Sequence, residues 1–151
     1  RQVRYLATVH KPAADPEADP TVQTITRQVA LIDDPNLSPS TPDHLLPLGV
    51  PAHYWLDLRG YDPVAVAAQL DLPMLIMQGG RDYQVTVTED LLGWQNGLAD
   101  RDNVTIRVYP ADDHLFFSGS GPSTPAGYEP AQHVDEAVVG DIARWISGTT
   151  L

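Results

Sequence analysis

The chain has 151 residues, the length of one domain, and a net charge of −11 from 20 acidic and 9 basic residues. This acidity argues against nucleic acids and anionic membrane surfaces as partners, because both are bound through Lys and Arg. The absence of cysteine excludes a disulfide scaffold, a cysteine–zinc site and a cysteine nucleophile. No apolar stretch approaches the roughly 20 residues of a membrane span, and no signal-like segment opens the chain, but the compartment stays open.

The first 60 residues are expected to form helices separated by proline-rich connections. Residues 1–10 carry apolar side chains at helical spacing. Asp19 is expected to cap a second helix that begins with Pro20. Residues 33–51 contain five prolines and are expected to be irregular, and residues 51–58 form a short aromatic helix.

From Tyr61 the pattern changes to alternating helices and strands. Residues 64–70 indicate a short Ala-rich helix, and Leu72–Met77 is apolar enough to be a strand buried on both faces. Thr86–Glu89 matches the capping box of a further helix, and Asn103–Tyr109 alternates as a second strand. Strand, helix and strand with short connections predict a right-handed crossover between parallel strands.

The remaining residues form a long loop and a terminal helix. Residues 111–131 are rich in Gly, Ser and Pro, and a loop of this length favours a functional role. The terminal helix carries a predicted core stripe of Val134, Val138, Ile142, Trp145 and Ile146. Two strands rarely make a stable sheet, so the α/β sheet is expected to be incomplete without upstream strands or a partner chain.

The candidate site follows from the ends of the two strands. Gly79 and Gly80 allow a close turn before Asp82, and the second strand leads to His114. Carboxyl ends of parallel strands meet at one edge of a sheet, where ligands and catalytic groups collect. An aspartate and a histidine there are two members of a Ser-His-Asp triad. The alternatives are a turn aspartate and a packing histidine.

Other candidates are weaker. Asp112 and Asp113 adjoin His114 and are interpreted as turn residues, with Asp113 as the reserve acid. A further alternative to a serine hydrolase is a metal-dependent hydrolase that uses His114 with Asp112 or Asp113. No His-x-x-x-His or His-Glu pair indicates a metal site, so neither metal nor cofactor is expected. The other histidines are interpreted as solvated, pocket-lining or capping side chains: His10, His44, His53 and His133.

The nucleophile is missing from the pattern. A serine hydrolase of this architecture needs a Gly-x-Ser-x-Gly elbow, and the chain contains none. Gly119-Ser120-Gly121 is similar only in composition and follows the histidine. The chain order Ser, Asp, His places the serine before Arg1, so this chain alone is expected to be inactive.

Residues from about Tyr54 to Ile146 resemble the C-terminal part of an α/β-hydrolase, on the side of dienelactone hydrolases, prolyl-oligopeptidase-like esterases and acyl-aminopeptidases. The matching motifs, in order, are Tyr61-Asp-Pro, Leu72–Val85, the helix with Trp94, and Tyr109–Phe116.

The resemblance implies that residues 61–151 carry the triad acid Asp82 and the triad base His114, and that residues 1–60 form a helical lid. It also implies that Tyr54, Trp55, Tyr83 and Phe116 line the substrate pocket. The expected reaction is hydrolysis of a carboxylic ester, or of an amide or peptide, with an upstream hydrolase portion as partner. The alternative is a non-catalytic binding or assembly module derived from the same fold.

Overall fold

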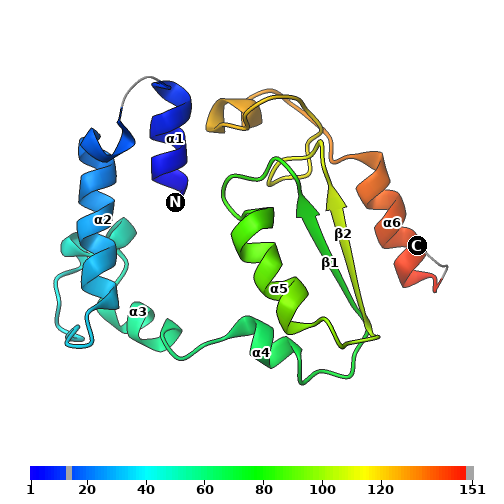
Figure 1. Cartoon of the computed structure of the whole chain (residues 1–151), viewed down its shortest axis with the longest axis horizontal. Helices are drawn as coiled ribbons and strands as arrows, with labels where there is room; N and C mark the ends of the chain where they lie inside the picture. Colours follow the sequence, from blue (N-terminus) through cyan, green and yellow to red (C-terminus); the bar gives the residue numbers. More distant parts are fainter. Residues whose placement is uncertain (13–14, 149–151) are drawn as a thin grey trace. The chain divides into compact units, whose positions relative to one another are not determined.

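The structure, a computed structural model, describes residues 1–12 and 15–148 (Figure 1). The chain divides into two compact units, Arg1–Asp62 and Pro63–Leu151. The expected division into a lid of residues 1–60 and a catalytic portion of residues 61–151 stays a prediction. Within the described ranges, no helix is long and apolar enough to cross a membrane.

In residues 1–12 and 15–62, the first unit contains three α-helices and short turns, largely as predicted. Asp19 caps the second helix, because its side-chain oxygen accepts the amide hydrogen of Thr21 at 2.8 Å, and Pro20 is the first helical residue. The irregular segment after this helix contains two 3₁₀ turns. The elements are α1 (Gln2–His10), α2 (Pro20–Asp33), α3 (Ala52–Leu58), and the 3₁₀ turns Pro16–Ala18, Asp43–Leu45 and Pro47–Gly49.

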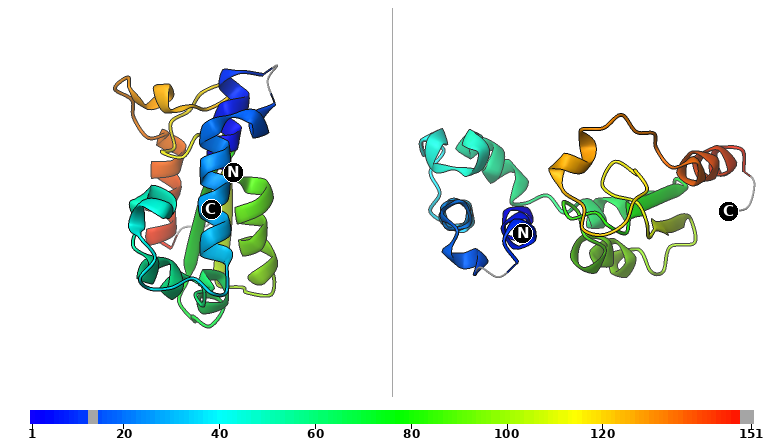
Figure 2. Two further views of the ribbon diagram at one scale, coloured as in Figure 1. Left: turned by 90° about the vertical axis from the view of Figure 1, so that its left-hand side faces the viewer. Right: turned by 90° about the horizontal axis from the view of Figure 1, so that it is seen from above.

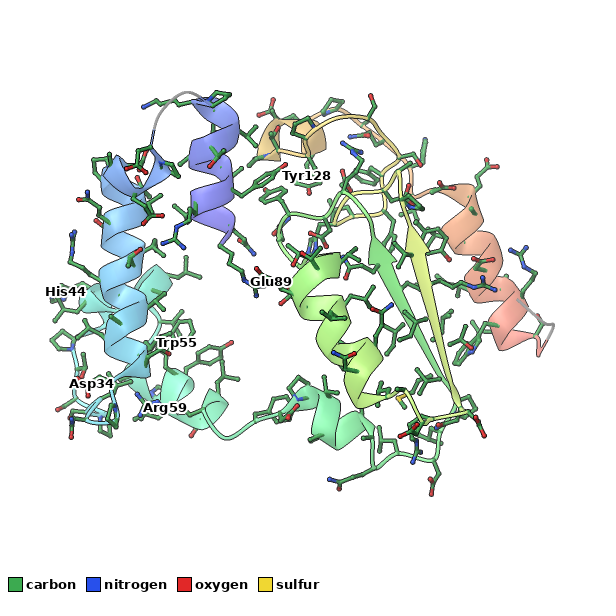
Figure 3. All side chains as sticks on the ribbon, viewed as in Figure 1. Asp34, His44, Trp55, Arg59, Glu89 and Tyr128 are labelled. Atoms are coloured by element: carbon green, nitrogen blue, oxygen red, sulfur yellow. The ribbon has the colours of Figure 1, made fainter. Side chains whose placement is uncertain are left out.

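Arg59 joins the end of α3 to the end of α2. Its guanidinium group donates hydrogen bonds to the carbonyl oxygens of Ile32 and Asp34 (Figure 3). Helices leave their last carbonyls without partners inside the helix, and a cation there also offsets the helix dipole. This side chain therefore closes the C-terminal end of α2.

The second unit contains the two predicted strands and the helices around them. The strand expected from Leu72 begins only at Met74 and continues to Gly79. Pro73, which has no amide hydrogen, precedes it. The first helix ends at Ala67, earlier than the predicted Leu70. The elements are α4 (Pro63–Ala67), β1 (Met74–Gly79), a π turn (Val87–Leu91), α5 (Leu92–Gly97), β2 (Val104–Tyr109), a 3₁₀ turn (Pro125–Tyr128) and α6 (Glu136–Ile146).

The strands β1 and β2 are parallel and in register from Met74 opposite Val104 to Gly79 opposite Tyr109. The helices α5 and α6 lie on opposite sides of this pair (Figures 1 and 2). At the starting edge, the Asn103 side chain donates to the carbonyl oxygen of Leu72 at 2.7 Å. Because Gly79 lies opposite Tyr109, both strands end at the same edge of the sheet. The segments that carry Asp82 and His114 follow these two ends.

The capping box predicted from Thr86 and Glu89 is wrong in one residue. The carboxylate of Asp90, not Glu89, accepts the amide hydrogen of Thr86 at 2.7 Å. The helix opens with a π turn, Val87–Leu91, which is one residue wider than an α turn. The added residue moves the acceptor from position 89 to position 90.

Burial in this unit is lower than predicted. Of β1, only Gln78 and Gly79 are buried, and the other residues are half-buried. Of the predicted stripe of the terminal helix, Val138 is buried and Ile146 is 72% exposed, whereas Val134 precedes α6, which begins at Glu136, and is 42% exposed. Two strands offer too little surface to cover the C-terminal end of α6, which leaves Ile146 exposed.

Candidate functional site

Two glycines let the ends of β1 and β2 approach each other closely. A Cβ atom added to Gly79 would lie 2.2 Å from the carbonyl oxygen of Asp113, and one added to Gly80 would lie 2.6 Å from Cα of Pro110. Neither glycine has a positive φ. Both positions therefore require glycine because of space, and the residues that follow the two strands are brought into contact.

Asp82 follows β1 in a tight turn and is held by main-chain donors. Its Oδ1 accepts the amide hydrogens of Gln84 at 2.8 Å and Val85 at 3.0 Å. The Asp82 side chain is only 5% exposed. These two hydrogen bonds offset part of the cost of burying the carboxylate.

His114 meets Asp82 across 32 residues of sequence. Its Nδ1 lies 2.8 Å from Oδ2 of Asp82. The imidazole is 38% exposed, and its Nε2 has no hydrogen-bond partner among the residues that the structure describes. A carboxylate that accepts from Nδ1 fixes the tautomer in which Nε2 can accept a proton. The two residues predicted from the strand ends thus form an acid–imidazole pair.

Gln78 is a further neighbour of Asp82, and its position there was not predicted from the sequence. It lies near the end of β1 and is 7% exposed. Its Nε2 donates to Oδ2 of Asp82 at 3.2 Å and to the carbonyl oxygen of Val85 at 2.8 Å. The only signal in the sequence was a polar side chain at the end of an apolar strand, immediately before the two glycines.

A second cluster of acidic side chains shapes the loop after His114. Oδ1 of Asp113 accepts the amide hydrogens of Leu115 at 2.9 Å and Phe117 at 3.1 Å, which makes it a turn residue. Asp112 is fully buried, and its Oδ1 lies 2.7 Å from Oγ of Ser118. Neither side chain contacts the imidazole of His114 in these hydrogen bonds.

Asp135 anchors the far end of this loop to α6. Its Oδ2 lies 2.7 Å from the same Ser118 hydroxyl, and its Oδ1 caps the helix at the amide of Ala137. The Ala137 amide, and then the Ser118 hydroxyl, hold the pKa of Asp135 below its usual value. The main-chain amide of Asp135 also donates to the carbonyl oxygen of Phe116 at 2.9 Å.

The predicted pocket residues fall in both units. Phe116 follows the imidazole in a left-handed conformation, with φ of 58°, and its ring packs edge-on against Tyr109. Tyr83, which follows Asp82 in the sequence, is buried. Tyr54 and Trp55 belong to the first unit, where their rings pack edge to face and the Trp55 indole donates to Val50. A pocket formed by these four side chains stays a prediction.

The remaining histidines take no part in this arrangement: His10, His44, His53 and His133 are all exposed. In residues 1–12 and 15–148, no three His, Asp or Glu side chains are grouped so that they could hold a metal ion. The contact between His114 Nδ1 and Asp82 Oδ2 is an arrangement that can accept and return a proton.

Among curated proteins, the chain is similar to Esterase EstD of Thermotoga maritima. The sequences are 47% identical over 105 residues, which make up 70% of this chain and 25% of that protein. The chain thus spans about a quarter of the length of this relative. No family model and no solved structure matches the chain.

Proposed function

We propose that this chain is the C-terminal portion of an α/β-hydrolase that cleaves carboxylic esters. The observation that carries the proposal is the 2.8 Å contact between His114 Nδ1 and Asp82 Oδ2 at the common edge of two parallel strands. The similarity to Esterase EstD supports the reaction class. Because the matched residues are 25% of that protein, the similarity also fits a catalytic serine in an upstream portion.

In the proposed mechanism, Nε2 of His114 takes the proton of the serine hydroxyl while the serine oxygen attacks the ester carbonyl. The carboxylate of Asp82 accepts from Nδ1 and stabilises the imidazolium ion that forms. The imidazolium then gives its proton to the leaving alcohol, and an acyl-enzyme remains. Water, deprotonated by the same imidazole, releases the carboxylic acid and restores the serine.

The first 60 residues would form a lid over the acyl group in this proposal. Tyr54 and Trp55 would supply apolar surface from the lid, and Tyr83 and Phe116 would supply it beside the triad. The exposed fraction of Tyr54, 48%, leaves its ring available for such a contact. An amide or peptide bond in place of the ester would use the same proton transfers.

Covalent labelling tests the position of the nucleophile. A fluorophosphonate probe reacts with an activated serine, and intact mass reports the adduct. We expect a label on the polypeptide that includes the proposed upstream region and none on this 151-residue chain. A label on this chain alone would point to one of its own serines, such as Ser120 or Ser123, and would contradict the proposal. No label on either would favour the non-catalytic module.

Two substitutions in the longer polypeptide test the roles of the pair. Asp82→Asn and His114→Ala should each lower ester turnover by a factor on the order of 10³–10⁶, by comparison with serine proteases. Asp102→Asn and His133→Ala are matched controls, because both side chains are exposed. Turnover near the normal rate in both test variants would contradict the assignment.

A further inference from the structure

The side-chain amide of Gln78 donates to Oδ2 of Asp82. We infer that Gln78 is a positioning residue, which fixes the orientation of the Asp82 carboxylate in the acid–imidazole pair. The inference rests on the proposed function, since it assigns Gln78 a part in the same reaction. Gln78 would not touch the substrate. It would act through Asp82 Oδ2, the oxygen that also meets Nδ1 of His114.

The amide orientation of Gln78 follows from its neighbours. Three oxygen acceptors lie within hydrogen-bond distance of Nε2: Gly79 O at 3.1 Å, Asp82 Oδ2 at 3.2 Å and Val85 O at 2.8 Å. A reversed amide would place its own oxygen against these three acceptors. The NH₂ group must therefore face Asp82, and its two hydrogens are shared among three acceptors.

With Gln78 in place, the Asp82 carboxylate has a complete set of partners. Oδ1 accepts two main-chain amides, from Gln84 and Val85, and Oδ2 faces Gln78 and His114. The main-chain amides fix only Oδ1. Gln78 is the additional donor that restrains Oδ2, the oxygen that sets the angle of the imidazole.

The same side chain also fastens the turn that contains Asp82. Gln78 belongs to β1, whereas Val85 lies seven positions later, beyond the turn. The 2.8 Å bond between them closes the turn onto the strand. Because Gln78 is 7% exposed, water cannot readily replace these contacts if the amide is removed.

Substitution of Gln78 by methionine removes the donors at nearly constant volume. In the longer polypeptide, Gln78→Met should lower kcat for an ester about tenfold and leave KM within about a factor of two, because a hydrogen bond to a charged group is lost. Gln95→Met on the exposed face of α5 is the matched control and should change neither constant. Unchanged kcat, or a rise in KM without a fall in kcat, would overturn the inference.

An NMR measurement on the unmutated 151-residue chain needs neither turnover nor a variant that folds. Gln78 and His114 share Oδ2 of Asp82, so the side-chain amide signals of Gln78 should shift as the His114 imidazole is protonated. The amide signals of Gln95 should not follow this titration. Gln78 signals that stay constant would overturn the inference.

The two proposals fail in different ways. If Asp82→Asn keeps normal turnover while the Gln78 amide follows the His114 titration, the pair exists but the ester hydrolase proposal fails. If the triad substitutions abolish turnover while Gln78→Met has no effect on kcat, the hydrolase stands and the positioning role fails.

Discussion

The guanidinium group of Arg81 donates from Nη1 to the carbonyl oxygen of Ala111, 30 residues further along the chain, at 3.0 Å. Its Nε donates to the carbonyl oxygen of Gly121, also at 3.0 Å. Arg81 immediately precedes Asp82, and Ala111 and Gly121 bracket the loop segment that contains His114. The Arg81 side chain thus connects the turn that contains Asp82 to both ends of the loop segment that contains His114.

Removal of the Arg81 hydrogen bonds should destabilise the loop of residues 111–121. Arg81→Ala should lower the free energy of unfolding by about 1–3 kcal/mol, because hydrogen bonds from a charged group are lost. Arg81→Lys should recover only part of it, since an ammonium group cannot reproduce the planar fork of the guanidinium. Urea denaturation measures the loss, and hydrogen exchange should show faster exchange in residues 111–121.

Arg27→Ala is the control for this comparison, because Arg27 is exposed on α2 and its guanidinium group donates to the hydroxyl of Thr24 in the same helix. Equal free energies of unfolding for Arg81→Ala and Arg27→Ala would show that the Arg81 hydrogen bonds do not stabilise the fold.

Gly79→Ala should be strongly destabilising. Its methyl carbon would lie 2.2 Å from the main-chain carbonyl oxygen of Asp113, and a Cβ atom cannot rotate away because the main chain fixes its position. The expected loss is about 1–3 kcal/mol or more. Thermal unfolding measures it, and the NMR signals of His114 should change because the ends of β1 and β2 are forced apart.

Gly93→Ala provides the opposite expectation for the same chemical change. Gly93 lies inside α5, and a Cβ atom there meets nothing within 4 Å. Alanine in a helix is favoured over glycine by about 0.5–1 kcal/mol, so this variant should be more stable than the unmutated chain. A similar effect from both substitutions would contradict the close approach at Gly79.

Tyr109 should ionise at unusually high pH. Burial, followed by the hydrogen bond that its hydroxyl donates to Asp141 at 2.7 Å, raises the pKa of Tyr109 from 10.0 to about 12. A raised folded-state pKa means that this stabilisation is complete below about pH 10 and is lost as pH rises towards 12. Ultraviolet titration of the tyrosines should show this late component.

Two variants identify the late component. Tyr109→Phe should remove it, and Asp141→Asn should move it to lower pH because the carboxylate no longer opposes the phenolate charge. A titration in which Tyr109→Phe removes a component near the ordinary value of 10.0 would contradict the prediction.

The cap at Asp19 should depend on pH in the opposite sense. The amide of Thr21 is the main cause that lowers the pKa of Asp19 below 3.8. A lowered folded-state pKa means that the stabilisation is present above the unfolded value and is lost as pH falls through the folded value. Asp19→Ala should therefore lower Tm at pH 7, and the difference from the unmutated chain should shrink in acid.

Asp33→Ala is the control at the other end of the same helix. Asp33 is the exposed last residue of α2, where the helix dipole disfavours a carboxylate. Its removal should leave Tm unchanged or slightly raised. A fall in Tm equal to that of Asp19→Ala would show that loss of charge, not loss of the cap, is responsible.

The sequence by itself determined the features that depend on near neighbours. The cap at Asp19, the helix that follows Pro20 and the strand that ends at Tyr109 were all predicted, because each rests on residues within a few positions of one another. The rule that parallel strands end at one edge also predicted that Asp82 and His114 would come together.

Only the tertiary structure decided the features that need two distant segments in one frame. Gln78 could not be assigned to Asp82 Oδ2 without the path of the turn, and the need for glycine at position 79 depends on Asp113, a residue of the other strand's loop. The exposure of Ile146 likewise depends on how far a two-stranded sheet extends beneath α6. Such features follow from packing distances, which no local pattern of residues encodes.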